Sequence, residues 1–256
     1  MQAINLLLLC LCIGEGYGAQ IRLMSYNMYG WNAMGTEAWK KENLFKTIRA
    51  SNPDLLGAQE IEGHQGETAA AIGSGYSFVD DGFGSHGIIY RTSVLTLEAF
   101  GLEKIYEQDQ WGQRYVTWAQ FRHSSGAMVD HFNTHLCVCD ELTLLKSAQR
   151  LAEVVATHRR PGSTALLTGD LNVFGGFENS QAVRFLKGEL GGNNNPFEDT
   201  FRVADPTGNG ETFPGGKIDY ILADYGTPVW SSVIDRTTVP YGQASDHFSI
   251  SAVIEI

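Results

Sequence analysis

The sequence predicts a single α/β domain. Segments rich in apolar, β-forming residues alternate along the chain with segments whose apolar residues recur at helical spacing. The length of 256 residues suits one such domain with one or two sheets. Hydrophobic residues make up 43% of the chain and charged residues 18%, so we expect a packed core rather than intrinsic disorder. We find no internal repeat and no linker long enough to divide the chain.

The first residues have the pattern of a signal peptide. Residues 4–13 are apolar except for Asn5, and four small residues follow between positions 14 and 19. We therefore expect a signal peptide over residues 1–19 and a catalytic domain over residues 20–256, with a secreted or organelle-lumen location reached through the secretory pathway. No Lys or Arg precedes the apolar run, and the alternative is a buried N-terminal strand. The run is shorter than the roughly 20 apolar residues that span a bilayer, so we expect no integral membrane segment after cleavage.

The first elements of the domain follow from local composition. Residues 21–27 predict a buried strand that ends in a polar residue. Residues 37–50 predict a helix, because apolar residues recur at helical spacing until Ser51-Asn52-Pro53 stops it. A short strand is expected over residues 54–60.

The same alternation continues to the C-terminus. We expect helices over 141–158 and 180–187, and a Gly/Asn-rich loop over 191–196. Further strands are expected over 87–91, 115–122, 128–135, 165–169, 218–223 and 248–255.

Signal cleavage would leave two of the four cysteines, Cys137 and Cys139. Along a strand both side chains would point the same way, with Cα atoms near the upper limit for a disulfide. The spacing therefore favours free thiols packed in the core over a bridge. If the strand continues, His131 and His135 share its face, and a soft metal such as Zn²⁺ is the alternative.

The net charge of −11 argues against a protein that binds nucleic acid mainly by neutralising phosphates. Basic pairs occur only at Lys40-Lys41 and Arg159-Arg160, and both are interpreted as solvated positions. A nuclease is not excluded, because a bound metal can supply the local positive field.

Polar residues suited to metal binding or proton transfer follow several apolar stretches. They are Asn27, Glu60, His135, Asp170 with Asn172, Asp219, and Asp246 with His247. Each alone is more commonly a turn residue or a structural group. Their joint occurrence at strand ends, where α/β proteins assemble their sites, predicts an active site.

The motifs around these residues resemble the endonuclease/exonuclease/phosphatase superfamily over nearly the whole mature chain. They are SYN (25–27), QE (59–60), NTHL (133–136), GDLN (169–172), KIDYIL (217–222) and SDH (245–247). The superfamily includes DNase I-like nucleases, abasic endonucleases, sphingomyelinases and inositol polyphosphate phosphatases. The resemblance implies a four-layer α/β sandwich with two packed mixed β-sheets flanked by helices.

The resemblance also implies a metal centre and a proton-transfer pair. Glu60 would be the principal metal ligand, with Asn27 and Asp246 completing the site. Oxygen ligands of this kind suit Mg²⁺ or Mn²⁺, with Zn²⁺ as an alternative. His247 would transfer protons, and Asp219 would hold its ring and raise its basicity.

Four further residues would act on the phosphate by the same resemblance. Asp170 would orient or activate water, and Asn172 would donate to a phosphoryl oxygen, with a turn cap as the alternative role. His135 would stabilise developing negative charge or protonate the leaving group. Arg114, just before the strand expected at 115–121, stands where many members keep a phosphate-facing cation.

These roles predict a divalent-metal-dependent phosphoesterase that hydrolyses phosphodiester bonds, either a nuclease or a lipid or small-molecule phosphodiesterase. The acidic charge and short loops favour a small phosphoester or lipid headgroup over duplex DNA. Large aromatic residues would either line the pocket or pack in the core. They are Trp31, Trp39, Phe83 and Trp111.

Two other functions fit the same scaffold. One is a carbonic-anhydrase-like hydratase that uses metal-bound hydroxide, which the two cysteines motivate. The other is a noncatalytic binding protein that retains the fold. The natural substrate, the metal and the oligomeric state are not determined by the sequence.

Overall fold

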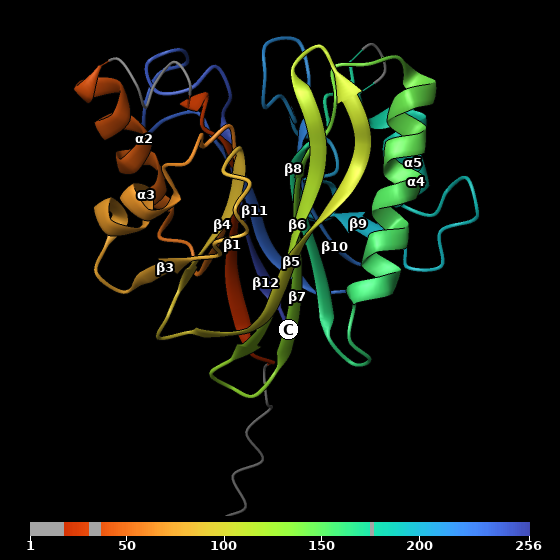
Figure 1. The fold of residues 1–256 in the computed structure, drawn as a ribbon, viewed down its shortest axis with the longest axis horizontal. Helices are drawn as coiled ribbons and strands as arrows, with labels where there is room; N and C mark the ends of the chain where they lie inside the picture. The colour runs from red at the N-terminus through yellow and green to blue at the C-terminus, as the bar shows by residue number, and fades with distance from the viewer. Residues whose placement is uncertain (1–17, 31–36, 175–176) are drawn as a thin grey trace, which may run out of the picture.

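Two six-stranded sheets pack face to face, and helices cover the outer face of each (Figure 1). The computed structural model describes residues 18–30, 37–174 and 177–256. This arrangement confirms the predicted four-layer sandwich. The predicted signal peptide falls almost entirely outside the described residues.

The first sheet has the order β11-β12-β1-β2-β4-β3. It contains β1 (Gln20–Asn27), β2 (Leu55–Gln59), β3 (Tyr76–Phe78), β4 (His86–Arg91), β11 (Val229–Asp235) and β12 (Ser249–Glu255). The second sheet has the order β5-β6-β7-β8-β10-β9. It contains β5 (Leu95–Asp109), β6 (Gly112–His123), β7 (Met128–His135), β8 (Thr164–Asp170), β9 (Phe197–Asp199) and β10 (Asp219–Asp224).

Both sheets are mixed, since each has one parallel pair at its centre. These pairs are β1 with β2 and β7 with β8, and their outer neighbours run antiparallel. Helices α2 (Ala38–Ser51) and α3 (Gln65–Ile72) cover the first sheet, and α4 (Glu141–His158) and α5 (Gln181–Leu186) cover the second (Figure 1). The remaining helical segments are η1 (Phe177–Asn179) and α6 (Thr200–Ala204).

Strand β1 shows why these segments are continuously apolar. Leu23 packs between the two sheets, whereas its neighbour Met24 packs under the outer helices. Side chains alternate along a strand, so a central strand buried on both faces needs apolar residues at successive positions.

All the strands and helices predicted from the sequence are present, with ends shifted by a few residues. The prediction missed β3, β5, β9, β11, α3 and α6. The longest of these, β5, lies at a sheet edge and carries charged residues and register shifts, for example between Leu97 and Ala99. Charges and bulges are common on exposed edges, where they remove the apolar run that marks a central strand.

One buried amide joins the two sheets. Asn133 on β7 accepts hydrogen bonds from Gln59 Nε2 (2.7 Å) and Thr168 Oγ1 (2.9 Å). Its own Nδ2 donates to the carbonyl oxygens of Ala58 and Gly87, both at 2.9 Å. Every donor and acceptor of the Asn133 side chain is therefore used, and the bonds fix the position of β7 against β2 and β4.

No helix among the described residues is long and apolar enough to cross a membrane.

We expect Gly57→Ala to destabilise the fold, because this position on β2 faces the inter-sheet network. A Cβ atom here would lie 1.9 Å from Thr168 Oγ1 and 2.7 Å from Asn133 Oδ1. The free energy of unfolding should fall by about 1–3 kcal/mol, measured by denaturant titration. Gly75→Ala is the control, because a Cβ atom there meets nothing within 4 Å. Equal unfolding midpoints for the two variants would contradict the role given to this contact.

Candidate active site

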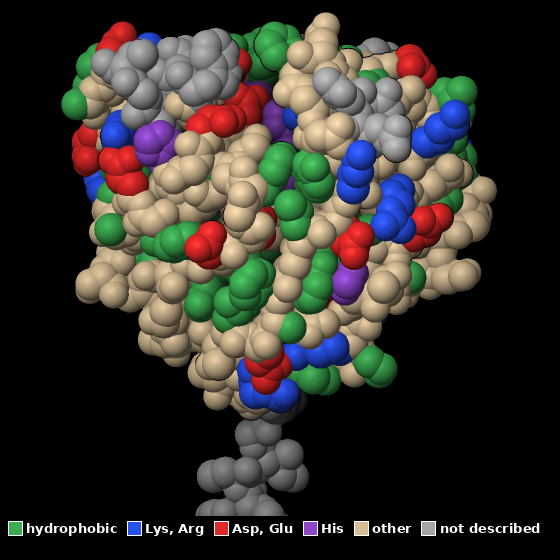
Figure 2. All heavy atoms as spheres, in the orientation of Figure 1, with side chains coloured by type: hydrophobic (Ala, Val, Ile, Leu, Met, Phe, Trp, Pro, Cys, Tyr) green, Lys and Arg blue, Asp and Glu red, His purple; other side chains and the backbone are tan. Residues whose placement is uncertain are grey.

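The predicted site residues gather at one end of the sandwich. Strands β1, β2, β7 and β8 all end there, and β10 begins there, because it runs antiparallel to β8. A pocket of about 370 Å³ opens at this end. In Figure 2, acidic and histidine side chains reach the surface together near the upper end of the molecule. Six of the nine predicted residues line the pocket: Glu60, Arg114, His135, Asp170, Asn172 and His247.

Asn27, at the end of β1, connects carboxylates from the two sheets. Its Nδ2 donates to Glu60 Oε1 and to Asp170 Oδ2, both at 3.0 Å, while its Oδ1 accepts from the backbone N–H of Tyr29. Asn27 therefore presents its amide nitrogen to both carboxylates, one from each sheet. Glu60 itself has a left-handed backbone with φ of 51°, a conformation that non-glycine residues adopt mainly at special sites.

His247 and Asp219 form the predicted pair. The Nδ1 atom of His247 lies 2.8 Å from Asp219 Oδ2, and both side chains are buried. The other ring nitrogen, Nε2, lies 3.8 Å from Asp170 Oδ2. Burial alone would lower the pKa of His247, but the Asp219 carboxylate, with help from Asp170 and Asp246, raises it to about 10.

Asp170 is the buried carboxyl group nearest the pocket. Burial raises its pKa, and the neighbouring negative charge of Asp219 raises it further. His135 Nε2 lies 3.5 Å from Asp170 Oδ2. Burial, together with the positive charge of Arg114, holds the pKa of His135 well below its usual value, so this ring is neutral at pH 7.

Asn172 and Arg114 also differ in detail from expectation. The Nδ2 of Asn172 donates to the carbonyl oxygen of Leu136 at 2.9 Å, so the side chain holds the loop after β7, as in the alternative capping role. Arg114 lies inside β6 rather than before it, since that strand begins at Gly112. Its Nε donates to Asp109 Oδ2 at 3.0 Å, which directs the guanidinium group at the pocket rim.

The carboxylates at this end of the sandwich fit a hard divalent cation. Among the described residues, Asp170, Asp219 and His247 each place a ligand atom within 4.8 Å of the others. This set differs from the expected ligands Glu60 and Asp246, and it already includes the His247–Asp219 contact. Asp246 lies beside this set, with its Oδ1 4.0 Å from His247 Nε2, and this oxygen accepts no hydrogen bond within the described part of the chain. Burial raises the pKa of Asp246. The hydrogen bonds and the positive charge around this carboxylate therefore do not fully replace the hydration that it loses on burial. Oxygen donors of this type suit Mg²⁺ or Mn²⁺ better than soft metals.

The family follows from this geometry and from the sequence. Residues 24–247 match the model of the endonuclease/exonuclease/phosphatase family. The chain belongs to the endonuclease/exonuclease/phosphatase family. Members of this family are hydrolytic phosphoesterases and typically depend on divalent metals. No curated protein matched the sequence significantly.

Solved structures share the fold of this endonuclease/exonuclease/phosphatase chain. The family protein from Bacteroides vulgatus aligns over 93% of this chain and 99% of its own, with 22% identity and a TM-score of 0.77. The mannosyl-6-phosphatase of Bacteroides thetaiotaomicron aligns over 92% and 100%, with 19% identity and a TM-score of 0.70. The human Nocturnin catalytic domain aligns over 92% and 94%, with 17% identity and a TM-score of 0.71.

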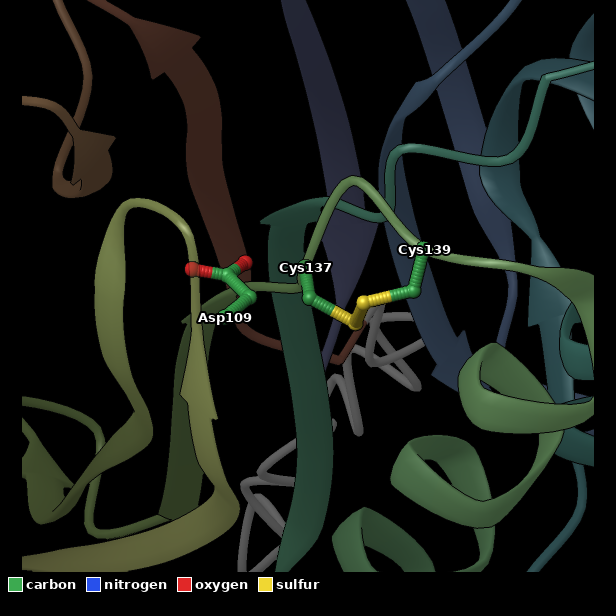
Figure 3. Close-up of side chains that lie close together, drawn as sticks. All are labelled: Asp109, Cys137 and Cys139. Atoms are coloured by element: carbon green, nitrogen blue, oxygen red, sulfur yellow. A yellow bond between two sulfur atoms is a disulfide. The ribbon is translucent and has the colours of Figure 1, made fainter.

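The prediction for Cys137 and Cys139 was wrong, because the two form a disulfide (Figure 3). Strand β7 ends at His135, so the cysteines lie in the following loop, where the chain turns and brings their Cα atoms to 5.3 Å. They share no strand face with His131, whose Nε2 instead lies 2.8 Å from Thr168 Oγ1. The pair offers no thiolate to a soft metal.

The sequence did not indicate most of the apolar part of the pocket wall. Val138, Phe174 and Phe213 line the pocket from loops that carry no periodic pattern. Trp111 also lines the pocket. This is the first of the two roles expected for the large aromatic residues, the other being core packing. Two others do not line the pocket: Phe83 packs against His86 and Tyr115, and Trp39 is exposed on α2. Trp31 lies outside the described residues.

We expect Asp219→Asn to lower the pKa of His247, because it removes the negative charge that raises it. In the wild-type protein the ring stays protonated at pH 7 and loses its proton only as the pH rises toward 10. In the variant this loss should occur about 1–3 pH units lower, measured by NMR titration of the metal-free protein. The control is Asp205→Asn, at an exposed position. An unchanged His247 titration in Asp219→Asn would rule out the pairing.

Cys137 and Cys139 should resist alkylation until the protein is reduced. Iodoacetamide added in denaturant, where burial no longer protects thiols, should label neither cysteine. The tryptic peptide of residues 123–146, which contains both, should then be recovered unmodified. After dithiothreitol treatment, mass spectrometry should show both cysteines labelled. Labelling without reductant would mean that the thiols are free.

Proposed function

We propose that this protein is a divalent-metal-dependent hydrolase of small phosphodiesters. The observation that carries the proposal is the convergence, in one pocket, of the Glu60–Asn27–Asp170 group with the His247–Asp219 pair. A phosphodiester needs charge neutralisation on its nonbridging oxygens, an activated water and help for the leaving oxygen.

Glu60 and Asp246 are the residues that would hold Mg²⁺ or Mn²⁺, with Zn²⁺ as the alternative metal. Asn27 would orient the Glu60 carboxylate, since its amide already donates to it. A cation bound there supplies Lewis-acid stabilisation of the phosphate and lowers the pKa of a coordinated water.

The remaining groups divide the proton transfers. Asp170, with its raised pKa, is suited to accept a proton from the attacking water near neutral pH. His247, held protonated by Asp219, would stabilise charge on the phosphate or donate a proton to the leaving oxygen. Neutral His135 and the Arg114 guanidinium group would hydrogen-bond to nonbridging oxygens.

The acidic surface supports a small substrate. With a net charge of −11, a long polyanion would be repelled outside the immediate metal site. We also propose that the leader of residues 1–19 directs the chain into the secretory pathway.

The hydratase alternative has lost the observation that motivated it, because the two cysteines are joined in a disulfide. The noncatalytic alternative predicts no turnover of any substrate and is tested by the same assay.

His247→Ala should lower kcat by about 10²–10⁴-fold for phosphodiester cleavage, because general acid–base groups contribute in this range. The substrates are bis(p-nitrophenyl) phosphate, plasmid DNA, sphingomyelin and carbon dioxide, each with Mg²⁺, Mn²⁺, Zn²⁺ or a chelator. His123→Ala is the matched control, since His123 is the last residue of β6 and lies outside the pocket lining.

Wild-type cleavage that the chelator abolishes supports the proposal, and the preferred substrate identifies the subclass. Metal-dependent carbon dioxide hydration without phosphoester cleavage would overturn it, and silence on the whole panel would favour a binding protein.

A further inference from the structure

The pocket has an apolar wall that the hydrolytic chemistry does not use. Its members are Trp111, Val138, Phe174, Phe213 and Ile218. We infer that this wall is a specificity subsite for an aromatic ring, so that the preferred substrate is a small phosphodiester with an aromatic group on one ester arm. The inference rests on the proposed function and deepens it.

The wall begins in contact with the reacting groups. The ring centroids of Phe213 and His247 are 4.9 Å apart. Those of Phe174 and Phe213 are 6.0 Å apart, in an edge-to-face arrangement. These aromatic rings therefore continue outward from the proton-transfer histidine. A group that packs on them while its phosphate faces His247 must be close to that phosphate, which indicates an ester substituent rather than a remote part of a large substrate.

Trp111 extends the wall from a separate element. It occupies the two-residue turn between β5 and β6, and its backbone N–H donates to Asp109 Oδ1 at 2.8 Å. The same carboxylate accepts from Arg114 through Oδ2, so one residue positions both the indole turn and the cation. Trp111 is 72% exposed and contributes little to the core, which is typical of an aromatic residue kept for binding.

Val138 is held in the wall by the disulfide. It is the single residue between Cys137 and Cys139 and is 47% exposed at the pocket. Leu136, just before the bridge, is fixed by hydrogen bonds to the segment of Asp170 and Asn172. This short apolar loop is therefore rigid on both sides, as a preformed wall requires.

The charges of the pocket restrict the occupant further. Among the described residues that line it, Arg114 is the sole Lys or Arg, while Glu60, Glu62 and Asp170 are acidic. With the protonated His247 this gives two side-chain cations beside three carboxyl groups, a balance that suits one phosphate group and disfavours polyphosphates and nucleic-acid strands. The volume of about 370 Å³ is at the small end of ligand sites, which fits one phosphate and one ring.

The test compares phosphodiesters that share one leaving group. Methyl, phenyl and thymidine-5′ p-nitrophenyl phosphates all release p-nitrophenolate: the oxygen of water bonds to phosphorus, the bond to the nitrophenyl oxygen breaks, and a phosphate monoester remains. The methyl ester carries no ring besides the nitrophenyl leaving group that all three share, and the other two add a simple aryl group or a nucleoside on the ester arm that the product keeps. The ring-to-methyl ratio is kcat/KM for an aromatic ester divided by kcat/KM for the methyl ester. Differences in the intrinsic reactivity of the esters cancel when this ratio is compared between a variant and the wild type.

We expect Trp111→Ala and Phe174→Ala each to lower the ring-to-methyl ratio by about tenfold for at least one aromatic ester. Both side chains are exposed, at 72% and 44%, so their removal should not unfold the protein. Trp230→Ala is the matched control, because Trp230 is also exposed but lies on β11, outside the pocket lining.

Equal ratios and an unchanged kcat/KM for the methyl ester in both pocket variants would overturn the subsite while leaving the proposed hydrolysis intact. A fall in kcat/KM shared by all three esters in the pocket variants, but not in Trp230→Ala, assigns the shared nitrophenyl ring to the subsite. If none of the three diesters is hydrolysed with any metal, the proposed function fails and the subsite inference with it. A ratio that falls for the thymidine ester alone assigns the ring to a nucleoside, and a fall for the phenyl ester alone assigns it to a simple aryl group.

Discussion

The active site depends on the hydrogen bonds of one buried amide, that of Asn133, between the two sheets. Its partners Gln59 and Thr168 stand one residue before Glu60 and two residues before Asp170 on their strands, and Asn133 itself stands two residues before His135. The bonds that align the sheets therefore also set the distances between Glu60, His135 and Asp170, the groups proposed to act on the phosphate. A buried amide is costly unless all its bonds are made, which gives this alignment a single favourable position.

The electrostatics of the site follow from how its charges are buried. Asp170 and Asp219 are both buried within reach of His247, and their mutual repulsion is only partly offset by that ring and by the Asn27 amide. Such a site is less stable than an apolar one of the same volume. A cation bound beside these carboxylates would relieve the repulsion, which is the second cause, after burial, of the raised pKa of Asp170.

The sequence predicted the central strands, the main helices and the set of polar residues at the strand ends, because central strands are apolar on both faces and end abruptly in polar residues. It could not predict β5, whose exposed edge has no apolar run. It also could not predict which atom of Asn27 faces Glu60, or that Asn172 would bond to Leu136, since both depend on contacts between distant segments. The disulfide was disfavoured for a similar reason: a strand was expected to continue through both cysteines, but the chain turns after His135.

In the hairpin of β5 and β6, the residues that support folding and the residue at the pocket rim lie in different parts of the chain. Strand β6 pairs with β7 inside the sheet, whereas the turn carries Trp111 in solvent at the pocket rim. Substitutions at the turn change no core packing, so mutation can alter the side chain at the pocket rim without a loss of folding stability. This hairpin is a place where descendants of one ancestral enzyme can diverge in substrate while inheriting the same catalytic residues.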